Sequence, residues 1–468
     1  MVIMIAGTSW VRRGIAKQQP DNIKLDPQTL KKMLEDEAEV PESTDMGEDS
    51  DDDTQESAKE PKAAEKPQGI RGSAPVEVPD DGDQDMDTER LLEDYDKPEE
   101  EKRDSGMKGV AVFASNMDDP YITTHEDPEE EEEKEDFELK PDDNLVAVAK
   151  IDGDAYSLEV YVYNETNDDW YVHHDYILTA PPLCLEAINY DPGNDDSPTS
   201  KGNLMAVGTM ESSISIWDLD IVNAMDPVVT LGKVKKIGRK KRDGTAQGHS
   251  DAVLDLSWNR LTPHVLASAG ADKTVVLWDL DQAKAAQIVP DFDREVQVVR
   301  WHPAEPTIFA AGTLGGHVYV CDCRSVEVAR PAEWQLGAQI EKAIWDHFNP
   351  FAIVAATEDG KIRYLDTRNT STPVWSVDAH QGACNGIALS PLTRGLLASV
   401  GEDRQLIVWK MGDGQPTMVN KEDSSLGPLH SVSFCPDSAS VVSVGGELND
   451  LLRIVDLRHF EAVVEAFQ

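Results

Sequence analysis

The sequence predicts an all-β protein, a seven-bladed β-propeller with a long acidic disordered insertion near its N-terminus. Two observations lead to this prediction. Past residue 144, short strand-like runs recur at a nearly constant spacing, which is typical of propeller blades. Residues 1–144 differ in composition: they contain 44 acidic and 17 basic residues, out of 89 and 43 in the whole chain of 468. The formal net charge of −46 is therefore concentrated in one segment, and the rest of the chain reads as one large folded unit.

The recurring unit ends in a β-type run that closes with Trp-Asp or a variant of it. Seven runs share this ending: 158–164, 214–218, 275–279, 318–322, 362–366, 406–410 and 452–456. From Asp279 onward the endings are 43, 44, 44 and 46 residues apart, and the wider step of 61 residues before Asp279 indicates an insertion. Each unit also has an earlier strand that ends in aromatic or proline residues, followed by a strand of small apolar residues. Three such strands and an outer fourth resemble the blades of WD-repeat proteins.

Two of the repeats carry the same four polar residue types at the same offsets of 0, 19, 23 and 29 residues. The sets are His249, Ser268, Asp272 and Trp278, and His380, Ser399, Asp403 and Trp409. In WD-repeat families such residues form a buried hydrogen-bonded relay, so the resemblance implies a structural role. A hydrolase triad is the alternative, but recurrence in two repeats favours the structural role. The fourth repeat has Phe292, Ala311, Gly315 and Cys321 at these positions, and blades with such degenerate positions are expected to rely on apolar packing.

The N-terminal residues resemble the inner strand of a blade. Residues 5–10 end in Ser-Trp, as do residues 253–258, and the first blade otherwise lacks an inner strand. We therefore expect residues 1–17 to complete blade 1, residues 18–143 to form an insertion within that blade, and residues 144–468 to form the propeller. Joining the first and last parts of the chain in this way would remove the open sheet edges of the ring.

The insertion is predicted to be disordered because its acidic blocks repel one another and it offers too little apolar area to offset chain entropy. Two interpretations remain open: a solvated linker, or a surface for basic partners such as histones or ribosomal proteins. Ser50 is followed by three Asp residues, which resembles an acid-directed kinase site. It is a candidate phosphorylation site, and the alternative is an unmodified linker serine.

A basic loop interrupts the chain between blades 2 and 3, at residues 233–242. Its seven bases are Lys233, Lys235, Lys236, Arg239, Lys240, Lys241 and Arg242. We favour a nuclear or nucleolar address. A contact with RNA or DNA phosphates, ribosomal RNA included, is the second interpretation. The third is an internal partner for the acidic insertion.

The chain is similar to the periodic tryptophan protein 1 family, a group of WD-repeat proteins. The likeness is carried by residues 10–17, 116–123, 171–175, 217–222 and 248–259, and it includes the acidic insertion and the basic loop. The resemblance implies a protein of the nucleus and nucleolus that supports ribosome biogenesis, with large-subunit assembly in fungal relatives and ribosomal-RNA gene chromatin in animal relatives. It implies no catalytic residues.

The composition narrows the function further. No run approaches 18 apolar residues, so we expect no membrane contact, and five cysteines without regular spacing favour reduced thiols over disulfides. We find no phosphate-binding glycine loop, nucleophile motif or metal-ligand cluster, and we expect neither a cofactor nor catalysis. The favoured function is a non-enzymatic scaffold that binds ribosome assembly factors and pre-ribosomal particles. The alternatives are a histone-binding chromatin adaptor that regulates ribosomal-RNA gene transcription, and a substrate receptor of a ubiquitin ligase.

Overall fold

The computed structural model describes residues 3–22, 137–167, 169–192, 202–232, 248–324, 329–412, 414–448 and 452–467. All of them belong to one of the two units into which the chain divides, which consists of Met1–Lys24 and Glu129–Gln468. Most of the predicted insertion 18–143, the basic loop 233–242 and Ser50 lie outside the described residues, so the expectations for them remain predictions.

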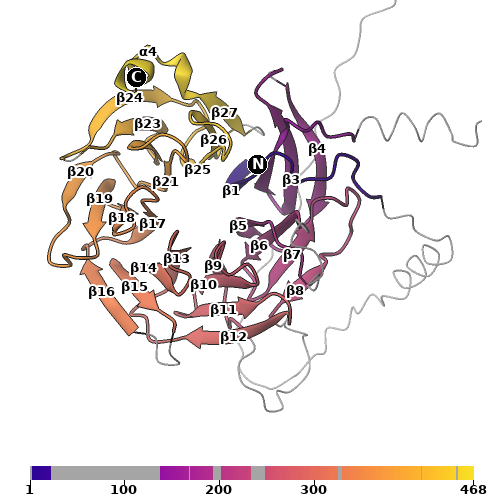
Figure 1. Cartoon of the computed structure of the whole chain (residues 1–468), viewed down its shortest axis with the longest axis horizontal. Helices are drawn as coiled ribbons and strands as arrows, with labels where there is room; N and C mark the ends of the chain where they lie inside the picture. Colours follow the sequence, from indigo (N-terminus) through magenta and orange to yellow (C-terminus); the bar gives the residue numbers. More distant parts are fainter. Residues whose placement is uncertain are drawn as a thin grey trace, which may run out of the picture. The chain divides into compact units, whose positions relative to one another are not determined.

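Seven antiparallel sheets are arranged in a ring (Figure 1), which confirms the predicted seven-bladed β-propeller. Blade 1 comprises β1 (Ile3–Val11), β2 (Asn144–Asp152), β3 (Ala155–Asn164) and β4 (Asp169–Ile177). Blade 2 comprises β5 (Pro182–Ile188), β6 (Leu204–Thr209), β7 (Ile214–Asp218) and β8 (Val229–Leu231). Blade 3 comprises β9 (Val253–Trp258), β10 (Val265–Gly270), β11 (Val275–Asp279) and β12 (Lys284–Val289). Blade 4 comprises β13 (Val296–Trp301), β14 (Ile308–Thr313), β15 (His317–Asp322) and β16 (Ala329–Gln335).

The remaining blades complete the ring. Blade 5 comprises β17 (Ile340–Trp345), β18 (Ala352–Thr357), β19 (Lys361–Asp366) and β20 (Trp375–Asp378). Blade 6 comprises β21 (Gly386–Leu389), β22 (Leu396–Val400), β23 (Gln405–Lys410) and β24 (Thr417–Asp423). Blade 7 comprises β25 (Leu429–Phe434), β26 (Val441–Gly446) and β27 (Arg453–Asp456). The chain continues into a 3-10 turn, Leu457–His459, and a short helix, α4 (Glu461–Ala466). None of the helices in the described part of the chain has the length and apolar character needed to span a bilayer.

The hydrophobic core is divided among the blade interfaces. Buried apolar side chains form seven clusters, and each joins two neighbouring blades around the ring. The second strand of a blade lies between two other strands and faces a neighbouring blade on each side. Strands such as β18 and β26 are therefore buried throughout, which explains their small side chains, since close-packed layers leave little volume.

The N-terminal strand closes the ring. β1 pairs antiparallel with β2, from Ile3 opposite Asp152 to Val11 opposite Leu145. It lies at the inner edge of blade 1 and contacts β25 and β26 of blade 7. The contact with β26 requires a glycine: a Cβ atom at Gly445 would lie 2.6 Å from Ile5 Cγ2. Among the described residues blade 7 has three strands where the other blades have four, and α4 packs against β24 of blade 6.

Candidate functional site

The first polar set forms a continuous relay in blade 3. Trp278 Nε1 donates to Ser268 Oγ at 2.8 Å, and Ser268 Oγ lies 2.7 Å from His249 Nε2. His249 Nδ1 lies 3.0 Å from Asp272 Oδ1. Burial alone would raise the pKa of Asp272, but hydrogen bonds from His249, Ser250 and Thr274 outweigh burial and lower the pKa to about 2. The relay thus ends on a carboxylate whose charge is held by several donors.

The second set repeats this geometry in blade 6. Trp409 Nε1 donates to Ser399 Oγ at 2.9 Å, His380 Nε2 lies 2.8 Å from the same oxygen, and His380 Nδ1 lies 2.8 Å from Asp403 Oδ1. Burial lowers the pKa of His380, although Asp403 partly opposes this. The serine is fully buried, so no substrate could reach its hydroxyl. This geometry favours a structural role over a hydrolase triad in both blades.

The blades without a full set differ in how they fill the equivalent space. In blade 4, Phe292 and Cys321 pack into an apolar cluster, as expected for degenerate positions. In blade 5, Arg363 Nη2 bonds to Asp359 Oδ2 at 2.8 Å, so this blade departs from the expected apolar packing. Sequence reasoning missed this pair because no histidine or tryptophan accompanies Asp359, although Asp359 occupies the position of Asp272 in the blade.

Blade 1 contains a polar chain that the sequence did not reveal. On β4, His173 Nδ1 lies 2.6 Å from His174 Nδ1, and His174 Nε2 lies 2.9 Å from the Tyr176 hydroxyl. That hydroxyl also lies 2.9 Å from the carbonyl oxygen of Asp218 in blade 2. Burial, with a smaller contribution from His173, lowers the pKa of His174 to about 3. These contacts join the outer strand of blade 1 to the next blade.

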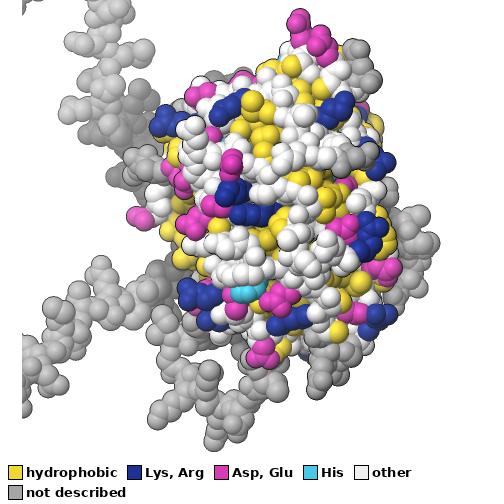
Figure 2. All heavy atoms as spheres, turned by 90° about the vertical axis from the view of Figure 1, so that its left-hand side faces the viewer, with side chains coloured by type: hydrophobic (Ala, Val, Ile, Leu, Met, Phe, Trp, Pro, Cys, Tyr) yellow, Lys and Arg dark blue, Asp and Glu magenta, His cyan; other side chains and the backbone are white. Residues whose placement is uncertain are grey.

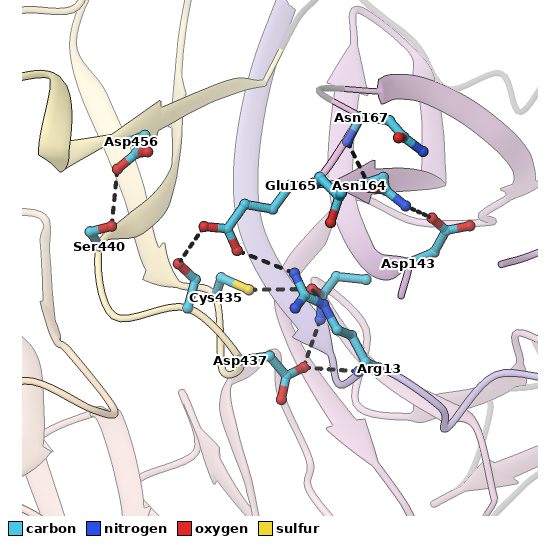
Figure 3. Close-up of polar contacts among 12 residues, drawn as sticks. Arg13, Asp143, Asn164, Glu165, Asn167, Cys435, Asp437, Ser440 and Asp456 are labelled. Atoms are coloured by element: carbon cyan, nitrogen blue, oxygen red, sulfur yellow. Dashed lines mark hydrogen bonds and ion pairs between the residues drawn. The ribbon is translucent and has the colours of Figure 1, made fainter. Parts of the chain in front are cut away.

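A further polar network joins blades 1 and 7 (Figure 3). Asp437 Oδ2 accepts from the Arg13 backbone N–H at 2.9 Å and from Asn144 Nδ2 at 2.8 Å. Glu165 bridges two arginines, with Arg13 Nη2 at 3.3 Å and Arg458 Nη2 at 2.6 Å. The network joins residues of blade 1 and of the segment after β1 to residues of blade 7 and the turn after it, so it complements the apolar contacts of β1.

The inner strands of blades 3, 4 and 5 end in tryptophans that border a hollow of about 330 Å³. Trp258 Nε1 donates to the carbonyl oxygen of Pro263 at 2.8 Å, and Trp345 Nε1 donates to that of Arg300 at 3.0 Å. Trp301 is 9% exposed, and its Nε1 has no acceptor among the described residues. Arg260 and Leu261, in the loop after β9, complete this wall.

The tryptophan-lined hollow adjoins a second hollow of about 260 Å³ at the centre of the ring, because Glu186, Arg260 and Arg300 border both. Arg300 Nη1 bonds to Asp255 Oδ2 and to the carbonyl oxygen of Leu256. Glu186 Oε1 accepts from the Trp258 backbone N–H at 3.1 Å. Burial raises the pKa of Glu186, although Arg300 and Arg260 partly offset this. The sequence predicted that the inner strands end in aromatic residues, but it did not predict that Glu186, Arg260 and Arg300 meet beside them.

Comparison with known proteins defines the class. The family model described as "WD domain, G-beta repeat" matches residues 240–279 and 371–410, the two repeats that contain complete relays. A chain in the crystal structure of a mitotic checkpoint complex has a related fold, with a TM-score of 0.51 and 18% identity over 66% of this chain and 83% of that chain. The propeller and its repeats are those of a WD-repeat protein.

The relatives define the family within that class. The periodic tryptophan protein 1 homolog of Drosophila melanogaster is 32% identical over 464 residues, which cover 98% of this chain and 95% of the relative. Periodic tryptophan protein 1 of Saccharomyces cerevisiae is 28% identical over 532 residues, which cover 99% of this chain and 90% of the relative. The chain belongs to the periodic tryptophan protein 1 family.

Proposed function

We propose that the protein is a non-enzymatic scaffold of the nucleus and nucleolus that supports ribosome biogenesis by binding large-subunit assembly factors and pre-ribosomal particles. The observation that carries this proposal is the 32% identity with a family member over 98% of the chain, which includes the segments outside the propeller. The family resemblance implies the ribosomal role.

The organisation of the propeller supports a binding role. Both relays are buried, and their polar groups are satisfied by one another, so their contribution is to hold the ring rigid. A rigid ring with variable loops presents binding surfaces without changing shape. The proposed roles of the basic loop as a nuclear address and of Ser50 as a phosphorylation site fit a scaffold whose location and charge are controlled outside the ring.

The proposal is tested by purifying the tagged full chain from nuclear extract, with and without RNase treatment, and identifying the bound proteins and RNA. We expect large-subunit assembly factors and precursor ribosomal RNA, with the proteins retained in part after RNase. Histones without assembly factors would favour the chromatin adaptor instead, and a cullin adaptor would favour the ubiquitin-ligase receptor. The tag alone, expressed at the same level, is the control.

A further inference from the structure

We propose that the tryptophan-lined hollow and the adjoining mouth of the central hollow bind an extended acidic segment of a partner protein. This inference rests on the proposed scaffold function, and it specifies the chemistry of a partner and where it docks. The inner strands and following loops of blades 2 to 5 form the tryptophan-lined hollow, and the inner strands of all seven blades line the central hollow.

The first argument is that cationic groups of the site remain available. Arg260 borders both hollows and Lys342 borders the central one. Neither side chain forms an ion pair or a hydrogen bond with another described residue, although Arg260 acts electrostatically on Glu186 and opposes the rise of its pKa. Arg300 is 28% exposed at its side chain and pairs with Asp255 through a single nitrogen, Nη1. Three cationic side chains from three neighbouring blades therefore face connected space.

The second argument is that the acidic groups of the site are already occupied. Asp255 Oδ2 accepts from Arg300 and, at 3.0 Å, from the Val299 backbone N–H. Glu186 is held by the Trp258 backbone N–H. Both carboxylates of the site thus accept hydrogen bonds from the protein, whereas the side chains of Arg260 and Lys342 bond to no described residue, and a carboxylate-bearing occupant complements this excess of cations.

The third argument is the apolar rim. Leu261 is 49% exposed in the loop after β9, and Pro303 is exposed in the loop after β13. The equivalent loops of blades 5 and 6 carry Phe351 and Leu392, which are 48% and 59% exposed. Because every inner strand runs in the same direction, these loops emerge on one face of the ring. An extended peptide can place apolar side chains on such a rim while its carboxylates face the bases.

A protein segment fits this site better than nucleic acid does. A phosphate backbone requires bases along its whole path, whereas the two hollows offer three cationic side chains, beside Glu186 and Asp255. Away from the hollows, the outer side of the ring that carries β20 shows basic, acidic and hydrophobic side chains interspersed, without a basic track along which a phosphate backbone could continue (Figure 2). The apolar rim also contributes little binding free energy to a phosphate, whereas it can bury a Leu or Phe side chain of a peptide.

The test is photo-cross-linking in the full-length chain within cells. Leu261 is replaced by a photo-reactive phenylalanine analogue, and the cross-linked peptides are identified by mass spectrometry. We expect cross-links to an acid-rich segment of another protein. The cross-linking yield should fall at least about tenfold in R260E, which corresponds to a loss of about 1.4 kcal/mol in binding free energy. K284E reverses an exposed base on β12, outside both hollows, and is the matched control that keeps the yield. Thermal unfolding of both variants checks that they fold.

The other outcomes overturn the proposal. Cross-links to RNA, to a basic or uncharged segment, or to this chain itself would contradict the proposal of an acidic partner. A cross-linking yield no higher than without irradiation would contradict it too, and so would an unchanged yield in R260E. The scaffold function fails separately: an acid-rich segment from a protein unrelated to ribosome assembly would keep the docking site and contradict that function. Cross-links to precursor ribosomal RNA would contradict the docking site and keep the function.

Discussion

The indole Nε1 of Trp10, in the first strand of the chain, donates a 3.1 Å hydrogen bond to the hydroxyl of Ser443, which is 433 residues away in the sequence. Trp10 also contacts the ring of Tyr163 edge-on, with centroids 5.8 Å apart. The two ends of the propeller are thus joined by buried side chains of neighbouring blades, with β1 paired inside blade 1.

Replacing Trp10 should therefore destabilise the whole ring. We expect W10A to lower the free energy of unfolding by about 3–5 kcal/mol, because it leaves a large cavity between blades 1 and 7. W10F keeps most of the packing and should cost about 1 kcal/mol for the lost hydrogen bond. Urea unfolding followed by tryptophan fluorescence measures both, with F351A at an exposed position as the control. Equal midpoints for W10A and the control would contradict the closure by β1.

The relays should contribute to stability and not to catalysis. H249A and H380A each strand a buried serine hydroxyl and a carboxylate, so we expect a loss of about 1–3 kcal/mol. H264A removes an exposed histidine of blade 3 and should leave the melting temperature unchanged. The structural role would be refuted if all three variants melted with the wild type.

Stability should fall in acid partly through Asp272. Because its folded pKa of about 2 lies below the ordinary value of 3.8, this carboxylate stabilises the fold above about pH 4. That contribution is lost as the pH falls from about 4 toward 2. D272N should therefore show a shallower loss of unfolding free energy over this range than D154N, a control at an exposed turn residue. Parallel curves for the two variants would argue against the hydrogen-bonded carboxylate.

Two of the three tryptophans at the hollow, Trp345 and Trp301, should respond differently to the loss of the indole N–H. W345F removes a donor that is bonded to the Arg300 carbonyl oxygen and should cost about 1 kcal/mol beyond the change in packing. W301F removes a buried donor that has no acceptor among the described residues, so its cost should be smaller. Chemical unfolding of the pair provides the comparison, and a larger loss in W301F would mean that this N–H is satisfied in solution.

The basic loop should direct the protein to its compartment. Changing its seven bases to Gln should shift a fluorescent fusion from the nucleus toward the cytoplasm, because transport receptors read such clusters as charge. A control fusion with Gln at the exposed Lys273 and Lys284 should keep the wild-type distribution. If both fusions remain nucleolar, the loop is not the address.

The repeat spacing predicted the seven blades because each blade is a local unit whose strands follow one another in sequence. The relays were predictable for the same reason, since His249 and Trp278 lie within one repeat. The polar contacts that close the ring were harder to predict. The ring brings its ends together and so places Arg13, Asn144 and Asp437 in contact, but nothing in the local sequence marks these residues as partners. The Asp359–Arg363 pair and the His173–His174 contact were missed because they satisfy buried polar groups with residue types that the repeat pattern does not specify.

The ring closure also has a consequence for biosynthesis. Strands β1 and β2 are adjacent in space but separated by 132 residues of chain, and Trp10 finds its acceptor only after Ser443 has been made. β1 can pair with β2 once residue 152 has been made, but its face toward blade 7 stays uncovered while almost the whole polypeptide is synthesised, at roughly 5–20 residues per second. A chain that terminates before blade 7 would leave Ile5 and Trp10 exposed. Burial of these two side chains is therefore complete only when the last blade has been synthesised.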